Sequence, residues 1–205
     1  MKTNRVRNAP VIYVALGDST GIGLGARNGG GYVDLILARL QQKHPGSRLV
    51  NLSTAWATTA DVLSKEMKRF PAEQATFVTI SIGVNDLVQG VGDEQFARNY
   101  EEIISSLEKT DAQIIITNLP DISLAPAVSE FRRLDVARVV ALFNQRIEEI
   151  AERHKLPLVN LYQISSALIQ SHPDFFSNDG LHPSDIGYQF WAEEMWPIVE
   201  KTVND

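Results

Sequence analysis

The chain has 205 residues, no cysteine and a formal net charge of -6 at pH 7. This length suits a single domain over residues 1–205, and the acidic balance argues against nucleic acid or an anionic membrane as the main partner, because both attract basic surfaces. The absence of cysteine excludes disulfides, thiolate metal sites and a cysteine nucleophile.

The amino-terminal residues carry Lys2, Arg5 and Arg7 ahead of an apolar run. The run 9–16 is at the short limit for a secretion signal and has no small-residue cleavage site, so we interpret it as a first strand. No other apolar run approaches the roughly 18 residues that span a bilayer. We therefore expect no integral membrane segment and a cytoplasmic protein.

Strand and helix patterns alternate along the first half of the chain. The apolar and β-branched run 11–16 predicts a strand, which stops at Gly17-Asp18-Ser19 and leads into a glycine-rich loop over 21–31. Apolar residues at helical spacing predict a helix over 32–40. The next expected elements are a short strand over 48–52, a helix that starts at a threonine cap and covers 58–70, and a strand over 76–82.

The second half continues this alternation. The loop 119–132 contains two prolines and is long enough to form a substrate lid or pocket wall, with an ordinary surface excursion as an equal alternative. The other expected elements are helices over 93–109, 133–154 and 161–170, strands over 113–118 and 157–160, and a last helix after the polar loop 171–183.

Five alternations without a hairpin signal predict an α/β fold. Parallel neighbours need crossover helices, so we expect a three-layer α/β/α arrangement around a parallel five-stranded sheet. Ligands bind beyond the carboxyl ends of the strands in such sheets. Polar residues follow the predicted strands in the segments Gly17-Asp18-Ser19, Asn51-Leu52-Ser53, Gly83-Val84-Asn85-Asp86 and Asn118-Leu119-Pro120, so we expect a site at this edge.

Ser19 is a candidate nucleophile, and a serine hydroxyl needs a base to act as one. The chain has four histidines. His44 and His154 fall near helix ends at the opposite edge of the predicted sheet, where histidines cap carbonyls or meet solvent. His172 and His182 lie in or beside the last loop and are the better candidates.

The segment Asp179-Gly180-Leu181-His182-Pro183 places a carboxylate three residues before an imidazole. A turn of this length can bring the Asp179 carboxylate to Nδ1 of His182 and leave Nε2 facing Ser19. The alternative is an Asx-type turn with a solvated histidine, which is favoured for this segment by itself. Likewise, Asn85 after the third strand suits either an oxyanion donor or ordinary turn chemistry. The joint occurrence of these segments favours catalysis.

In four segments the chain resembles the SGNH or GDSL hydrolase family of esterases, lipases and thioesterases. In the family's order these are Gly17-Asp18-Ser19, Asn51-Leu52-Ser53 with Thr58-Thr59-Ala60-Asp61, Gly83-Val84-Asn85-Asp86, and Asp179-Gly180-Leu181-His182-Pro183. The resemblance implies a flavodoxin-like sheet and hydrolysis of carboxylic esters, such as lipid, lysophospholipid or small acyl esters, without a metal or organic cofactor. It implies Ser19 as nucleophile, His182 as base and Asp179 as the orienting acid. It also implies Asn85 as an oxyanion donor beside the Ser19 backbone amide. The substrate would be a small-molecule acyl ester.

One position departs from the family pattern. Members usually have a glycine in the second segment whose backbone amide completes the oxyanion hole, and Trp56 stands at that position here. The amide survives the substitution, but the side chain would be strained if the position needs positive φ, and it would project into or beside the acyl pocket. The alternative is that Trp56 packs against the glycine-rich loop. Reduced activity, a narrowed pocket and a different substrate class are all open.

Other classes of protein fit less well. The glycines of Gly21-Ile22-Gly23-Leu24-Gly25 could approach a pyrophosphate, but they come too late after the strand, and no acid follows the second strand to bind a ribose. No pair of histidines has the spacing of metal ligands. A catalytically silent ligand-binding protein on the same fold is the better rival, and Trp56 is the feature that supports it.

Overall fold

The structure of the protein is a computed structural model that describes residues 9–28, 30–72, 74–169 and 172–204. Five strands form one sheet in the order β2-β1-β3-β4-β5, and all neighbouring strands are parallel. The strands are β1 (Ile12–Gly17), β2 (Arg48–Asn51), β3 (Phe77–Ser81), β4 (Gln113–Thr117) and β5 (Leu158–Val159). This confirms the predicted parallel sheet and its flavodoxin-like order.

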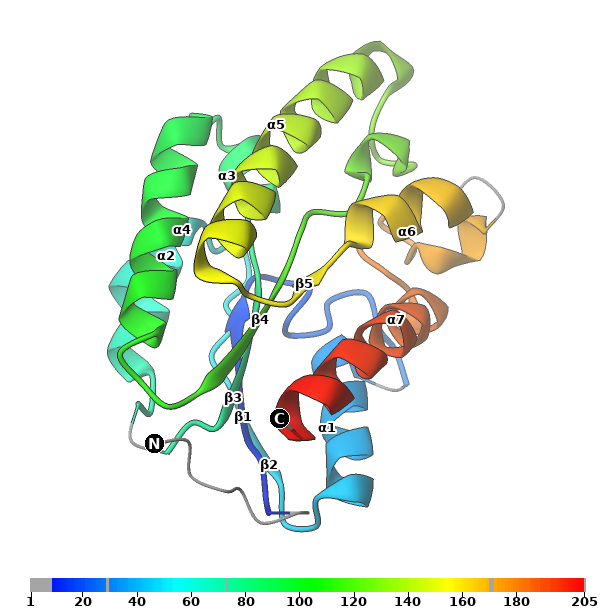
Figure 1. The fold of residues 1–205 in the computed structure, drawn as a ribbon. Helices are drawn as coiled ribbons and strands as arrows, with labels where there is room; N and C mark the ends of the chain where they lie inside the picture. The colour runs from blue at the N-terminus through cyan, green and yellow to red at the C-terminus, as the bar shows by residue number, and fades with distance from the viewer. Residues whose placement is uncertain (1–8, 29, 73, 170–171, 205) are drawn as a thin grey trace.

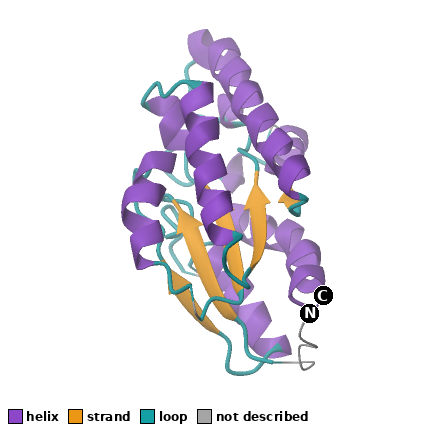
Figure 2. Cartoon of the chain, turned by 60° about the vertical axis from the view of Figure 1, so that its left-hand side comes forward, coloured by secondary structure: helices purple, strands orange, loops and turns teal. Residues whose placement is uncertain are grey.

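Helices cover both faces of the sheet. Figures 1 and 2 show α1 and α7 on one side, and α4 and α5 on the other. The α-helices are α1 (Tyr32–Lys43), α2 (Thr59–Asp61), α3 (Val84–Val88), α4 (Asp93–Leu107), α5 (Glu130–His154), α6 (Leu161–Leu168) and α7 (Asp185–Asn204). Shorter segments are the π-helical η1 (Val62–Glu66) and the 3₁₀ turns η2 (Met67–Arg69), η3 (Ile122–Leu124) and η4 (Pro173–Phe175).

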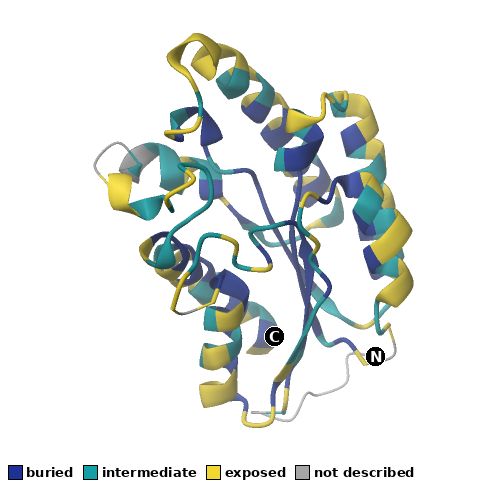
Figure 3. Ribbon diagram, turned by 180° about the vertical axis from the view of Figure 1, so that it is seen from behind, coloured by how far each residue is buried: buried dark blue, intermediate teal, exposed yellow. Residues whose placement is uncertain are grey.

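The strand β1 is buried on both faces, which explains its continuous apolar sequence. Successive side chains of a strand point to opposite faces. Tyr13 and Ala15 accordingly pack with the residues of α1 and α7, whereas Val14 and Leu16 pack with those of α4 and α5. Figure 3 shows the same division, with dark blue strands between helices whose outer faces are exposed.

The end of β1 directs the next residues toward the edge of the sheet. Gly17 pairs with Ser81 of β3, and a Cβ atom at Gly17 would overlap the Ser81 carbonyl oxygen. Only glycine therefore fits where the chain leaves the sheet. Asp18 and Ser19 follow directly, beyond the carboxyl end of the strand.

Several predicted boundaries differ from the structure. The Asn85-Asp86 segment begins the short helix α3, because Gly83 turns the chain with φ 134° and its carbonyl accepts from the amide of Leu87. The helix expected over 58–70 is helical from Thr59 to Arg69, but its middle is π-helical. The last residue of the helix expected over 161–170 lies outside the described residues.

The loop expected over 119–132 is shorter than predicted, and its first part, residues 119–125, is not a surface excursion. The helix α5 begins at Glu130, three residues before the predicted start at 133. Leu119, Ile122 and Ala125 are buried, and the first two lie on the wall of a cavity beside Ser19. The pocket-wall alternative is therefore confirmed. Separately, none of the helices in the described ranges is both long and apolar enough to cross a membrane.

Candidate active site

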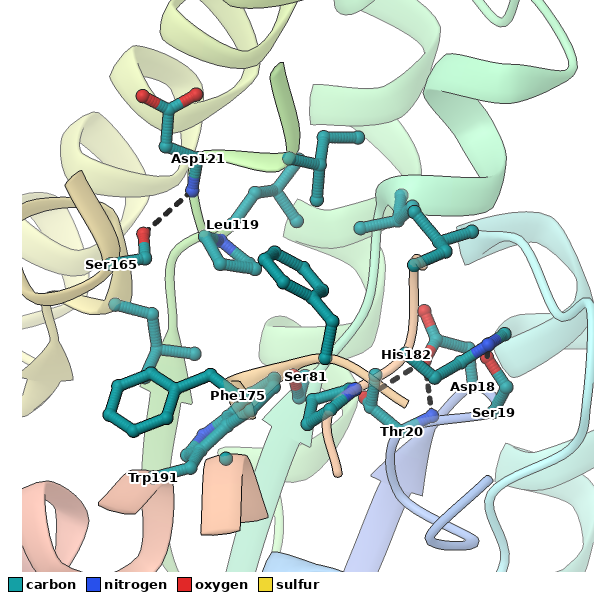
Figure 4. Close-up of a pocket in the computed structure, with 18 of the residues that line it drawn as sticks. Asp18, Ser19, Thr20, Ser81, Leu119, Asp121, Ser165, Phe175, His182 and Trp191 are labelled. Carbon is teal, nitrogen blue, oxygen red and sulfur yellow. Dashed lines mark hydrogen bonds between the residues drawn. The ribbon is translucent and has the colours of Figure 1, made fainter. Parts of the chain in front are cut away.

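A hydrogen-bonded chain of side chains lies at the carboxyl edge of the sheet. His182 Nε2 is 2.9 Å from Ser19 Oγ, and His182 Nδ1 is 2.7 Å from Asp179 Oδ2. Ser19 follows β1 and His182 precedes α7, so residues separated by 163 positions meet here. Figure 4 shows the imidazole of His182 directed at Ser19. The structure thus brings together the serine, histidine and aspartate that the sequence singles out.

The turn that carries Asp179 holds its carboxylate in the charged form. Oδ1 accepts from the amides of Leu181 at 2.8 Å and His182 at 2.9 Å, while Oδ2 faces the imidazole. Burial works to raise the pKa of Asp179, but these hydrogen bonds outweigh it and hold the pKa well below its usual range. A charged carboxylate accepts the Nδ1 proton of His182, which leaves Nε2 free to accept a proton from Ser19.

Three hydrogen-bond donors surround the same cavity next to Ser19. Asn85 is buried at the start of α3, and its Nδ2 donates to the Ala57 carbonyl at 2.9 Å. An amide nitrogen has two hydrogens, so a second one is left for a ligand. The backbone amides of Ser19 and Trp56 donate to no other residue in the described part of the chain. Ser19, Trp56 and Asn85 all line the cavity, which suits them to receive a negative oxygen.

Trp56 occupies a backbone conformation that favours glycine. The turn 54–57 is closed by a 3.1 Å hydrogen bond from the Ala57 amide to the Thr54 carbonyl, and Trp56 is its third residue with φ 64°. Turns of this kind with positive φ at the third residue are normally completed by glycine. The side chain is 68% exposed and lines the cavity beside Ser19, as the sequence predicted, so most of its surface is not packed against the protein.

Comparing Trp56→Gly with Trp56→Ala separates backbone strain from occlusion of the cavity. Both substitutions remove the ring, but only glycine relieves the positive φ. We expect the free energy of unfolding, measured by urea titration, to be about 1 kcal/mol higher for the glycine variant than for the alanine variant. Occlusion predicts a rise in kcat/KM in both variants, and strain predicts a rise in the glycine variant alone. An unchanged profile in both would count against either effect.

Glu66 is bonded to Gly17, two residues before Ser19, and was not among the residues predicted from the sequence. Its Oε2 accepts from the Gly17 amide at 3.0 Å, while the Gly17 carbonyl accepts from the Thr54 amide at 3.0 Å. The peptide groups on both sides of Gly17 are therefore held by the segment that also carries Trp56. The one available signal was the spacing, because Glu66 stands four residues after the buried Val62 and so on the buried face of a helical segment.

Burial changes the charge state of Glu66. The side chain is 1% exposed, and its Oε1 has no partner in the described ranges. Burial raises the pKa of Glu66 to about 8, against the opposing effect of the Gly17 amide and with the Asp18 carboxylate adding to the rise. At neutral pH the carboxyl group is therefore largely protonated.

This raised pKa predicts a loss of stability as the pH rises. Between its unfolded value near 4.5 and about 8, the unfolded chain releases the proton of Glu66 while the folded chain retains it. The free energy of unfolding should fall by about 3 to 5 kcal/mol from this group across that window. Glu66→Gln keeps an acceptor for the Gly17 amide and cannot ionise. The free energy of unfolding of this variant should therefore fall less than that of the parent protein over the same pH range. Urea unfolding of both proteins at several pH values checks this, and parallel pH profiles would contradict it.

Two further buried acids shape the loops around Ser19. Asp18 Oδ1 accepts from the amide and hydroxyl of Thr20 at 3.0 and 2.9 Å. Asp86 accepts from the amide and hydroxyl of Thr59 at 2.9 and 2.6 Å. Burial raises the pKa of both carboxyl groups. Their hydrogen bonds fix the backbone after β1 and the start of α2 against α3.

The other three histidines have separate partners. His44 caps the end of α1, and its Nδ1 is 3.1 Å from the Ala9 carbonyl. His154 ends α5 between two carboxylates, those of Glu101 and Glu108. The predicted helix-end positions of these two histidines are thus confirmed. His172 stacks on a phenylalanine ring of η4.

The parallel sheet and the serine, histidine and aspartate chain at its carboxyl edge have the architecture of hydrolases that use a serine nucleophile. Residues 15–190 match the model of the GDSL-like lipase/acylhydrolase family. The chain belongs to this family, as the sequence resemblance predicted.

Named relatives agree with this assignment. The chain is 24% identical over 187 residues to esterase TesA of Pseudomonas aeruginosa, covering 91% of this chain and 87% of TesA. It is 23% identical over 172 residues to an acetylxylan esterase of Geobacillus stearothermophilus, covering 80% of this chain and 78% of that protein.

Solved structures extend the agreement to the fold. The structure of Axe2, an acetylxylan esterase from Geobacillus stearothermophilus, matches with a TM-score of 0.77 at 19% identity, covering 94% of this chain and 95% of Axe2. The family and the esterase relatives confirm the prediction of a carboxylic ester hydrolase. Nothing in these likenesses favours a silent binding protein.

Proposed function

We propose that the protein hydrolyses carboxylic esters through an acyl-enzyme in which Ser19 is the nucleophile, His182 the base and Asp179 the orienting acid. The observation that carries this proposal is the continuous chain of 2.9 and 2.7 Å contacts that links Ser19 Oγ to the Asp179 carboxylate through the imidazole. A serine hydroxyl becomes an effective nucleophile when a base within such a distance removes its proton.

The first half of the reaction forms the acyl-enzyme. Ser19 Oγ attacks the ester carbonyl carbon as its proton passes to His182 Nε2, and the carbonyl electron pair moves onto oxygen. The amides of Ser19 and Trp56 and the side chain of Asn85 donate to that oxyanion. The intermediate then collapses, the bond to the alcohol oxygen breaks, and the alcohol takes the proton from His182.

The second half releases the acid. Water attacks the acyl carbon and gives its proton to His182 Nε2. Collapse of the second intermediate returns this proton to Ser19 Oγ and frees the carboxylic acid. The charged Asp179 stabilises the imidazolium that forms in each half, because its pKa lies well below its usual range.

A fluorophosphonate probe tests the nucleophile directly. Such a probe phosphonylates an activated serine and loses fluoride, so mass spectrometry of the digested protein should find the adduct on Ser19. The heat-denatured protein is the matched control, because its serines lack the imidazole and should stay unlabelled. An adduct on a different serine, or equal labelling of native and denatured protein, would overturn the assignment of Ser19.

We propose that residues 1–205 act as one domain, in keeping with the single sheet over the described ranges. The substrate is a small-molecule ester, as the family implies. A cytoplasmic location stays a prediction from the sequence.

A further inference from the structure

We infer that the substrate carries a medium-length uncharged apolar chain, either on its acyl or on its alcohol side, and that this chain lies in the cavity beside Ser19. The inference rests on the proposed ester hydrolysis and adds the chemical class of the substrate. A small acetyl ester of a sugar and an ester with a phosphate near the reacting bond are the classes that it disfavours.

Most of the cavity wall is apolar. A volume of about 180 Å³ opens beside Ser19 between the loops after β3 and β4, the helix α6 and the segment before α7. Engineered apolar cavities of about 150 Å³ already bind benzene. The side chains that form most of this wall are aliphatic or aromatic, among them Leu119, Ile122, Leu161, Ile164, Phe175 and Phe190.

The polar groups on the far part of the wall are already bonded within the protein. The Asp121 amide donates to Ser165 Oγ at 2.7 Å, and Ser165 Oγ donates to the Tyr162 carbonyl at 3.0 Å. Figure 4 shows this pair and the Asp121 carboxylate turned away from Ser19. Trp191 Nε1 has no partner in the described part of the chain, but it has almost no accessible surface. Sugar hydroxyls would thus lose hydrogen bonds to water and find few replacements.

The charges on the wall also disfavour an ionic substrate chain. Among the described residues that line the cavity there is no lysine or arginine, so a phosphate or carboxylate would have no cationic partner. The ionisable groups that do line it are His182, Asp18 and Asp121, and both aspartates are buried. Carboxylates at these places would repel an anion, whereas an uncharged hydrocarbon chain packs against the aliphatic and aromatic side chains that form most of the wall.

Chain-length series of esters test this inference. One arm compares p-nitrophenyl acetate, butyrate, hexanoate and octanoate, and the other compares ethyl, butyl, hexyl and octyl acetate by titration of released acid. Each buried methylene can raise kcat/KM by up to about fourfold. We therefore expect kcat/KM for the ester with an eight-carbon chain to exceed kcat/KM for the ester with a two-carbon chain by on the order of 100-fold in at least one arm. The arm that rises identifies which side of the ester the cavity holds.

A pair of matched variants ties the preference to the cavity. Ile164→Asn places an amide in the wall of the cavity on α6. Leu142→Asn places the same residue on the 39% exposed surface of α5. The ratio of kcat/KM for the octanoate and acetate esters should fall about tenfold in Ile164→Asn and stay unchanged in Leu142→Asn. This ratio is measured within one preparation, so partial unfolding of a variant does not change it.

Two results would overturn this inference alone, and a third would also overturn the proposed function. A flat or falling series in both arms, with clear hydrolysis of the short esters, would refute the apolar chain while leaving ester hydrolysis intact. A ratio that Ile164→Asn leaves unchanged would refute the assignment of the cavity. Absence of hydrolysis for every ester would overturn the proposed function itself, and this inference with it.

Discussion

Ser19→Ala is expected to remove ester hydrolysis, with kcat for p-nitrophenyl butyrate lower by about 10⁴- to 10⁶-fold. The substitution deletes the oxygen that lies 2.9 Å from His182 Nε2 and leaves the surrounding donors in place. The reaction then has no group to form the acyl-enzyme, and only binding and oxyanion stabilisation remain. Initial rates over a range of enzyme concentrations measure the loss.

A surface serine provides the control for this experiment. Ser64 is exposed on the π-helical turn, where its hydroxyl donates to the Ala60 carbonyl. Ser64→Ala should keep the rate of the parent protein. Circular dichroism and thermal unfolding of Ser19→Ala should match the parent, because Ser19 is not one of the hydrophobic residues that form the two core clusters. A folded Ser19→Ala protein that keeps more than a tenth of the parent rate would refute the assignment of Ser19 as the nucleophile.

Asp179→Asn is expected to lower kcat by about 10⁴-fold at neutral pH. The asparagine oxygen can still accept from the amides of Leu181 and His182, so the turn persists. Its Nδ2 group then faces His182 Nδ1 and donates to it. That contact selects the tautomer with the proton on Nε2, which can no longer accept the proton of Ser19.

The segment before Asp179 offers a matched control. Asp174 stands 3.7 Å from the Nδ1 of His172, a second aspartate and histidine pair close in sequence to the first. Asp174→Asn should leave kcat/KM unchanged, because that pair does not reach Ser19. Equal rates in the two asparagine variants would remove Asp179 from the mechanism.

Much of the fold could be predicted because the central strands β1, β3 and β4 are buried on both faces. The runs 11–16, 76–82 and 113–118 consist mostly of apolar or β-branched residues, and the helices between them leave a parallel order as the simple solution. The flavodoxin-like order itself came from the family resemblance, since periodicity does not tell which strands are neighbours. The short strand Leu158–Val159 lies within the predicted strand 157–160.

The elements that escaped prediction depend on contacts between distant residues. A turn and a helix start fit the sequence Gly83-Val84-Asn85-Asp86 equally well. The packing around Gly83 favours the helix start, which is that of α3. The π-helical turn is not visible in the spacing of apolar residues. Its last residue, Glu66, accepts a hydrogen bond from the Gly17 amide, 49 positions earlier in the chain.

The candidate site was predictable in its residue types and less so in its geometry. Ser19, His182 and Asp179 stood out because each lies in a polar segment after a strand or before the last helix. Their hydrogen-bond distances depend on how the fold brings the loop after β1 next to the segment before α7, and the sequence alone does not give that placement. Trp56 could be matched to its position only by counting along the second segment, and its positive φ required the structure.

The turn 54–57 also bears on how such enzymes are recognised in sequence collections. A pattern that demands the letter glycine at position 56 would pass over this chain, although the chain path and the free amide are both present. What the turn requires is a backbone angle, and the surroundings of the turn hold tryptophan at φ 64°. The position is better defined by conformation than by residue type. Variation there then adds a side chain at the mouth of the cavity while the amide stays in place.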